Sequence, residues 1–304
     1  MKGLQNAGIA ALVECIVGII SNSLLLIVIF FNPLNNLRKA SWMIMTNLAL
    51  ADLLTSMATI PNYYPGEELL NHIKIDKALY MANVFLHIGY SSSFFFILLF
   101  AIERYIAIKH PIQSSYIITK KRNFAVIILC WAVAIIFGGL AYYDGVHQNK
   151  VFIGLYGILE LATLVMILFQ ILIIRNIKEA SENVQGGSNR EAHMKNISVT
   201  IVMLILILIV TAFPFFIAKQ VEFVQRQYPH LITAEMANLF PYYYLPVASL
   251  NFILNPFIYA WRFPDYRWAF GALFKKKSLR RQTRGQRSGH TLISQRETIE
   301  TTPC

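Results

Sequence analysis

The sequence predicts an all-α membrane protein, a bundle of seven transmembrane helices followed by a short amphipathic helix. Of its 304 residues, 56% are hydrophobic and only 14% are charged, a composition too apolar for a soluble domain of this length. Seven stretches approach or exceed the roughly 20 apolar residues that a membrane span requires. None of them alternates with the period of two that membrane strands show, so each span is expected to be helical.

The predicted spans follow one another closely along the chain. They are residues 8–31, 42–61, 78–102, 124–143, 152–174, 197–218 and 238–261. The first stretch has some features of a signal peptide, but its apolar run continues to Phe31 without a convincing small-residue cleavage site. We therefore interpret it as the first span.

Apolar residues recur at helical spacing after the last span, opposite charged residues. This pattern predicts an amphipathic helix over residues 263–274, lying on the membrane surface. We expect one membrane domain over residues 1–274, with this helix at its end, and a disordered basic tail over 275–304. Lys275 to Lys277 are expected to contact anionic membrane lipid.

Basic residues predict the orientation in the membrane. Lys and Arg gather in the loops after the first, third and fifth spans and in the tail, whereas acids slightly outnumber bases in the other loops. By the positive-inside rule, the amino terminus is expected outside and the carboxyl terminus in the cytoplasm. The net charge of +11 follows from this asymmetry, and we expect no nucleic-acid partner.

Several polar motifs occur at fixed places in the spans. In chain order they are Asn22 in the first span, the run Asn47-Leu48-Ala49-Leu50-Ala51-Asp52 in the second, Glu103-Arg104-Tyr105 at the end of the third, Trp131 in the fourth, Pro214 in the sixth, and Asn255-Pro256-Phe257-Ile258-Tyr259 in the seventh. With these motifs in this order, the chain resembles the rhodopsin-like (class A) G-protein-coupled receptors. Its short second outer loop, and Leu79 near the place of the usual cysteine, loosely resemble the branch of melanocortin, cannabinoid and lysophospholipid receptors.

The resemblance implies a receptor at the plasma membrane that passes an extracellular ligand's signal to a heterotrimeric G protein. The residues that it implicates in switching and coupling are Glu103, Arg104, Tyr105, Asn255, Pro256 and Tyr259. Independently of the resemblance, a guanidinium at the end of a span can pair with Glu103 and, when released, offer its donors to a partner's carbonyls. The alternative is an arginine that only extends toward the membrane surface.

An aspartate within the second span requires polar partners, because an isolated carboxylate in hydrocarbon costs several kcal/mol. By the resemblance, the partners of Asp52 are Asn22, Ser93, Asn251 and Asn255, and together they hold an allosteric sodium ion near Asp52 and Ser93. The alternative is a polar network that needs no ion. Apart from this sodium, we expect no cofactor.

Candidate ligand-binding residues are aromatic or polar side chains in the outer halves of the spans. They are Tyr63, Leu86, His87, Tyr90, Glu160, Phe215, Lys219 and Tyr243. Leu86 stands where amine receptors carry an aspartate and Ser249 where opsins carry a lysine, so neither ligand class is expected. Glu160 is a carboxylate among leucines, and we expect it to pair with Lys219 or His87.

Other features leave alternatives open. The fifth span lacks the family's proline and lower tyrosine, with Gln170 near the tyrosine's place, and Met194 replaces an acid at the position of the usual lock to Arg104. A decoy receptor that does not signal is therefore an alternative, as is a seven-span transporter, although no internal repeat favours the latter. No catalytic constellation occurs, so we expect no enzyme. Ser and Thr in the tail suggest arrestin-type partners.

Overall fold

Helices occupy all seven predicted spans wherever the structure describes them. A computed structural model describes residues 2–32, 37, 40–62, 75–110, 112–147, 151–183, short stretches between 202 and 231, and 233–273. The helices are α1 (Lys2–Phe31), α2 (Ala40–Thr59), the 3-10 turn η1 (Ile60–Asn62), α4 (Ile75–Lys109), α5 (Ser114–Ile117), α6 (Lys120–His147), α7 (Val151–Asn183) and α9 (Ala234–Arg262). The described positions between 202 and 227 and those over 264–273 are helical as well.

Two helices extend well beyond the spans predicted for them. α4 ends at Lys109 instead of residue 102, and α7 ends at Asn183 instead of residue 174. Hydropathy marks only the part of a helix that lies in hydrocarbon, whereas the backbone hydrogen bonds continue into the polar residues beyond it. The extension of α4 therefore places Glu103 and Arg104 within the helix.

Four of the described helices are long and apolar enough by themselves to cross a membrane. They contain the stretches Gly8–Phe31, Leu79–Lys109, Lys120–Tyr143 and Gly154–Asn176. α2 and α9 carry polar residues among their apolar ones, including Asp52 and Asn255. These residues lower the hydropathy of two helices that the bundle buries.

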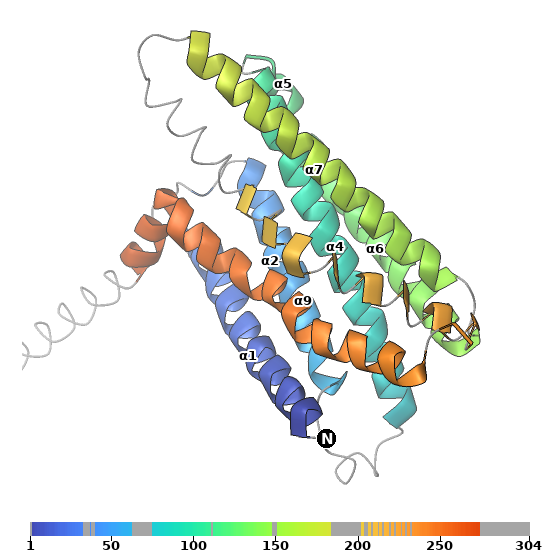
Figure 1. Ribbon diagram of the computed structural model, residues 1–304. Coiled ribbons are helices and arrows are strands. Elements are labelled where there is room, and N and C mark those ends of the chain that lie inside the picture. Colours follow the sequence, from blue (N-terminus) through green and yellow to red (C-terminus); the bar gives the residue numbers. More distant parts are fainter. Residues whose placement is uncertain are drawn as a thin grey trace, which may run out of the picture.

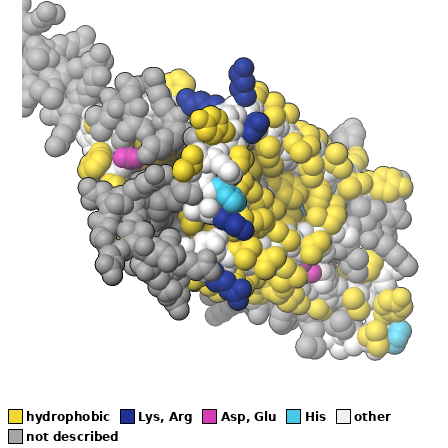
Figure 2. All heavy atoms as spheres, turned by 90° about the horizontal axis from the view of Figure 1, so that it is seen from above, with side chains coloured by type: hydrophobic (Ala, Val, Ile, Leu, Met, Phe, Trp, Pro, Cys, Tyr) yellow, Lys and Arg dark blue, Asp and Glu magenta, His cyan; other side chains and the backbone are white. Residues whose placement is uncertain are grey.

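The helices form a bundle around α4 (Figure 1). α4 packs against α2, α6 and α7, while α1 packs against α2 and α9. α5 lies where α4 is joined to α6, at the end of the bundle that also carries Arg104, here named the Arg104 end. Exposed basic side chains, including Lys109, Lys120 and Arg122, gather at this end (Figure 2).

A short amphipathic helix follows α9. This helix covers residues 264–273. Tyr266, Ala269 and the preceding Phe263 are buried, while Arg267 and Trp268 are exposed. Burial raises the pKa of the Tyr266 phenol to about 12, so this side chain stays neutral at physiological pH. The tail over 275–304 lies outside the described residues.

α2 and α4 approach each other closely at Gly89. A Cβ atom on this residue would lie 2.9 Å from the Thr55 backbone nitrogen and 3.1 Å from the Ala51 carbonyl oxygen, and closer still to the Thr55 hydroxyl. Two of these three atoms belong to the backbone of α2 and cannot turn aside. A side chain at this position would therefore force the two helices apart.

We expect Gly89→Ala to destabilise the bundle by about 1–3 kcal/mol, the usual cost of overpacking. Gly139→Ala on α6 is the matched control, because no atom lies within 4 Å of a Cβ there and alanine favours a helix. Thermal unfolding of the purified protein in lipid nanodiscs measures both. Equal melting temperatures for the two variants would contradict close packing at Gly89.

Candidate functional site

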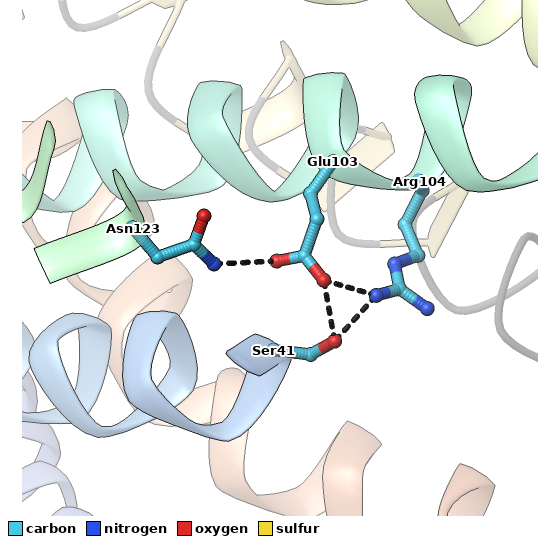
Figure 3. A network of polar contacts seen from close by, with 4 residues as sticks. All are labelled: Ser41, Glu103, Arg104 and Asn123. Atoms are coloured by element: carbon cyan, nitrogen blue, oxygen red, sulfur yellow. Dashed lines mark hydrogen bonds and ion pairs between the residues drawn. The ribbon is translucent and has the colours of Figure 1, made fainter. Parts of the chain in front are cut away.

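An ion pair lies at the Arg104 end of α4. Arg104 donates from its guanidinium to the Glu103 carboxylate and also to the Ser41 hydroxyl of α2. Ser41 in turn donates to Glu103 Oε1 at 2.6 Å, and Asn123 Nδ2 of α6 lies 3.5 Å from Glu103 Oε2. Figure 3 shows the four side chains converging from three helices. The acid and the arginine are therefore tied to α2 and α6 as well as to each other.

The Arg104 side chain is folded back onto the bundle. Its side chain is 12% exposed, its guanidinium lies over the Phe100 ring at 5.6 Å from the centroid, and its Nε is buried without a hydrogen-bond partner among the described residues. This geometry differs from that of an arginine that extends toward the membrane surface. It leaves donors of the guanidinium available for a different partner.

Tyr105, the third residue of the motif, points away from the ion pair. Its ring lies edge-on to Phe169 of α7 at 5.5 Å, and its hydroxyl accepts from Lys109 Nζ at 2.9 Å. Tyr105 therefore joins α4 to α7. It makes no contact in the network of Figure 3.

A second polar cluster surrounds Asp52, which is fully buried. Ser93 Oγ of α4 donates to one carboxylate oxygen and Asn255 Nδ2 of α9 to the other, both at 2.7 Å. Asn22 Nδ2 of α1 donates to the Phe252 carbonyl oxygen of α9 at 3.0 Å. The structure thus brings Ser93 of α4 and Asn255 of α9 to the Asp52 carboxylate of α2, while Asn22 joins α1 to α9.

Several oxygens near Asp52 lack a donor among the described residues. Both polar atoms of the Asn251 amide are buried without a hydrogen-bond partner, as are Oδ1 of Asn22 and of Asn255. A carboxylate, a hydroxyl and amide oxygens are hard ligands of the kind that a small hard cation takes. Asp52 and Ser93, which contact each other, therefore fit a sodium ion in their chemistry, and Asn251, one helical turn before Asn255, is the third side chain that would hold it.

Transition metals take ligand sets of His, Cys, Asp and Glu side chains. Over the part of the chain that the structure describes, no group of three or more His, Cys, Asp and Glu side chains could hold a metal ion.

The motif at the end of α9 begins at Asn255, in the Asp52 cluster, and continues to Tyr259. Pro256 and Tyr259 are buried, and the Tyr259 ring is tilted against Phe263 at 5.9 Å. The Tyr259 hydroxyl and the Gln170 amide of α7 are both buried without a partner among the described residues. Polar groups from α7 and α9 are thus left unsatisfied in this arrangement.

The candidate ligand-binding residues are only partly brought together. Leu86 is buried in α4, and the Tyr90 ring lies edge-on to Phe252 of α9 at 4.7 Å. The side chains of Tyr63, Phe215, Lys219 and Tyr243 lie outside the described residues, as does Met194. Whether these residues share one pocket therefore stays a prediction.

His87 makes a contact that the sequence did not suggest. Its Nδ1 lies 2.7 Å from the Asn83 carbonyl oxygen, which can only accept, so this nitrogen carries the proton. Nε2 is then the acceptor for the Tyr156 hydroxyl of α7 at 3.2 Å. Tyr156 was absent from the predicted set, although it stands one helical turn before Glu160 on the same side of α7.

Glu160 shows no pairing through Oε1, which is buried without a hydrogen-bond partner among the described residues. We expect Glu160→Gln to raise the melting temperature by a few degrees, because it removes a partly desolvated charge at little change in volume. The check is thermal unfolding in nanodiscs. Gln170→Glu would add a carboxylate lower on the same helix and serves as a control of opposite sign. A lower melting temperature for Glu160→Gln would indicate that the carboxylate has a stabilising partner.

Comparison with known proteins finds similarity to seven-transmembrane receptors. The family model "7 transmembrane receptor (rhodopsin family)" matches residues 21–151. Sphingosine 1-phosphate receptor 3 of Takifugu rubripes is 26% identical over 93% of this chain and 74% of its own length. The Allatostatin-A receptor of Bombyx mori is 23% identical over 84% of this chain and 75% of its own, and Melanocortin receptor 5 of Rattus norvegicus is 26% identical over 88% and 84%.

The helical bundle, the ordered motifs and these similarities support a seven-transmembrane receptor, since the relatives are receptors and not enzymes. The chain is similar to the rhodopsin-like (class A) G-protein-coupled receptors, and its apolar helices and these relatives support a multi-pass protein of the plasma membrane. The predicted fold class is thereby confirmed. The loose similarity to melanocortin and lysophospholipid receptors is confirmed at the level of sequence identity.

Proposed function

We propose that this receptor transmits the signal of an extracellular ligand to a heterotrimeric G protein through Arg104. The observation that carries the proposal is the Glu103–Arg104 ion pair at the end of α4. A buried pair of this kind has two arrangements, one in which Arg104 is held by Glu103 and Ser41, and one in which its donors turn to a partner. A ligand that favours the second arrangement shifts the population of the receptor toward it.

The chemistry of Arg104 suits a protein partner. A guanidinium stays charged and presents five donors in a planar fork, which matches carbonyl oxygens at the end of a partner's helix. The orphaned Tyr259 hydroxyl and Gln170 amide are further polar groups on the helices around α4. Neither group has a hydrogen-bond partner among the described residues, which supports a second arrangement in which they find one.

The orientation and the remaining partners belong to the same proposal. The exposed basic side chains at the Arg104 end support a cytoplasmic position for this end and an amino terminus outside. Sodium held by Asp52, Ser93 and Asn251 would act as an allosteric ion. Arrestin-type proteins and anionic lipid are proposed partners of the tail. The ligand is not assigned.

Two alternatives predict different behaviour. A decoy receptor would bind a ligand without engaging a G protein, and a transporter would need no G protein at all. The buried Arg104 Nε, which has no hydrogen-bond partner among the described residues, favours a bundle that rearranges at that end, which a decoy does not require.

Complex formation tests the proposal without a known ligand. The receptor is reconstituted in nanodiscs with purified heterotrimeric G proteins, and the bound nucleotide is removed enzymatically. We expect a nucleotide-free complex that co-elutes and that GTPγS dissociates. Co-elution that GTPγS leaves unchanged would argue against coupling, as would no binding to any class of G protein when a control receptor binds.

A further inference from the structure

Glu103 is held by two neutral donors in addition to Arg104, and these donors come from different helices. The residue is 4% exposed. Ser41 of α2 donates to Oε1 at 2.6 Å, and Asn123 of α6 lies 3.5 Å from Oε2 and is itself 7% exposed. The two contacts reach opposite oxygens of the carboxylate (Figure 3).

The release of Arg104 creates a physical difficulty at Glu103. A buried carboxylate that loses its cation is an uncompensated charge, which is strongly destabilising. Hydrogen bonds from neutral donors offset part of this cost, and they are stronger when the acceptor is ionised. After the arginine has left, neutral donors that remain on Glu103 would therefore lower the free energy of the second arrangement, and proton uptake is the other way to offset the cost.

Ser41 and Asn123 have the geometry for this task. Ser41 accepts from Arg104 while it donates to Glu103, so the departure of Arg104 leaves its donated bond in place. The 3.5 Å contact of Asn123 is at the long end of the range for a hydrogen bond. A small shift of Glu103 toward α6 would shorten it once Arg104 no longer pulls on the carboxylate.

We propose that Ser41 and Asn123 are positioning residues that hold the Glu103 side chain in place when Arg104 turns to its partner. This inference rests on the proposed function and adds to it. In the second arrangement, Ser41 of α2 and Asn123 of α6 stabilise Glu103, and Arg104 is the side chain that moves. The opposite view, that the two residues only fasten the three helices together, predicts the same contribution whether or not Arg104 is present.

A stability cycle separates the two views without ligand or G protein. Arg104→Ala imitates the loss of the cation. The double change Ser41→Ala and Asn123→Ala is made in three backgrounds: the wild type, Arg104→Ala and Glu103→Gln. We expect it to lower the melting temperature by roughly 2–4 °C more in Arg104→Ala than in the wild type. In Glu103→Gln we expect a smaller decrease than in the wild type. An equal or smaller decrease with Arg104→Ala would overturn the inference.

Milder variants keep the test decisive where the double variant does not fold. Asn123→Ala alone is carried through the same backgrounds, and Ser41→Thr, which keeps the hydroxyl, is expected to behave as the wild type. The matched control is Thr46→Ala on α2, whose hydroxyl donates only within its own helix, to the Trp42 carbonyl. Its effect is expected to be the same in every background, and background dependence like that of Asn123→Ala would count against the inference.

Nucleotide exchange on purified G protein provides the second readout. Asn123→Ala is expected to lower ligand-free exchange about 5-fold, or about 1 kcal/mol, and to have no effect when Glu103 is Gln. If the wild type catalyses exchange but the melting-temperature effects of the substitutions are additive, the inference is refuted and the proposed function is not. If the effect of Ser41 and Asn123 on the melting temperature depends on Arg104 as expected but no variant, Glu103→Gln included, catalyses exchange, the proposed function is refuted. The role of Ser41 and Asn123 toward Glu103 is then still supported.

Discussion

Asp52→Asn is expected to abolish the stabilisation of this receptor by sodium. A ligand that binds only the folded state stabilises it by RT ln(1 + [L]/Kd), about 1.4 kcal/mol at ten times the Kd. Asp52 is the one carboxylate among the side chains that fit the ion, because Ser93, Asn251 and Asn255 supply only neutral oxygens. Without that charge, the remaining oxygens are expected to hold sodium too weakly to matter.

Thermal unfolding in nanodiscs measures the effect, with sodium chloride exchanged for choline chloride at constant ionic strength. The wild type is expected to melt a few degrees higher in sodium, and Asp52→Asn at the same temperature in both salts. The matched control is Ser92→Ala, because the Ser92 hydroxyl donates to carbonyls of its own helix and not to Asp52. Sodium dependence that persists in Asp52→Asn would show that the ion binds elsewhere.

The contacts of Asp52 illustrate what could be predicted from the sequence. Its depth in the second span required polar partners, and the family resemblance named Ser93 and Asn255, both of which donate to it. The spans themselves were predictable because twenty or so apolar residues in a bilayer leave the backbone no alternative to a helix. The ends of α4 and α7 were not, because polar residues continue a helix without any hydropathy signal.

The partners of Glu103 show where such prediction ends. Ser41 and Asn123 are common polar residues near the ends of two spans, and nothing in their spacing links them to Glu103. Their contacts depend on how α2 and α6 are rotated against α4, which side-chain packing over the whole interface determines.

The contact between His87 and α7 could not be predicted from the sequence either. Glu160 and Tyr156 stand one turn apart on one side of α7, so either could have met His87. The relative height of α4 and α7 decides between them, and it brings the Tyr156 hydroxyl to His87 Nε2. A carboxylate attracts attention in an apolar run, whereas a tyrosine does not.

Arg104→Ala is expected to leave the bundle folded and to abolish exchange on the G protein. Arg104 lies at one end of α4, and its contacts with Ser41 and Glu103 are local. Leu86, His87 and Tyr90, the described candidate residues on α4, lie several helical turns before Arg104 on the same helix. Because Ser41 and Asn123 still contact Glu103, loss of the side chain is expected to cost only on the order of 1 kcal/mol in stability while removing the donors that a partner would use.

Arg104→Lys separates the contribution of the planar guanidinium donors from that of the positive charge. Lysine keeps the positive charge next to Glu103 but offers a single ammonium in place of a planar set of donors. We expect it to restore the melting temperature and less than about a tenth of the exchange. Full exchange by Arg104→Lys would indicate that charge alone is sufficient.

The most direct measurement is nucleotide exchange on purified heterotrimeric G protein, normalised to folded receptor in nanodiscs, for the wild type and Arg104→Ala side by side with receptor-free discs. The account predicts exchange above the receptor-free level for the wild type and exchange at that level for Arg104→Ala. Equal exchange by the two receptors above the receptor-free level would contradict the switch role of Arg104. Receptor-free rates for both, across all classes of G protein and with a control receptor active, would contradict the proposed coupling.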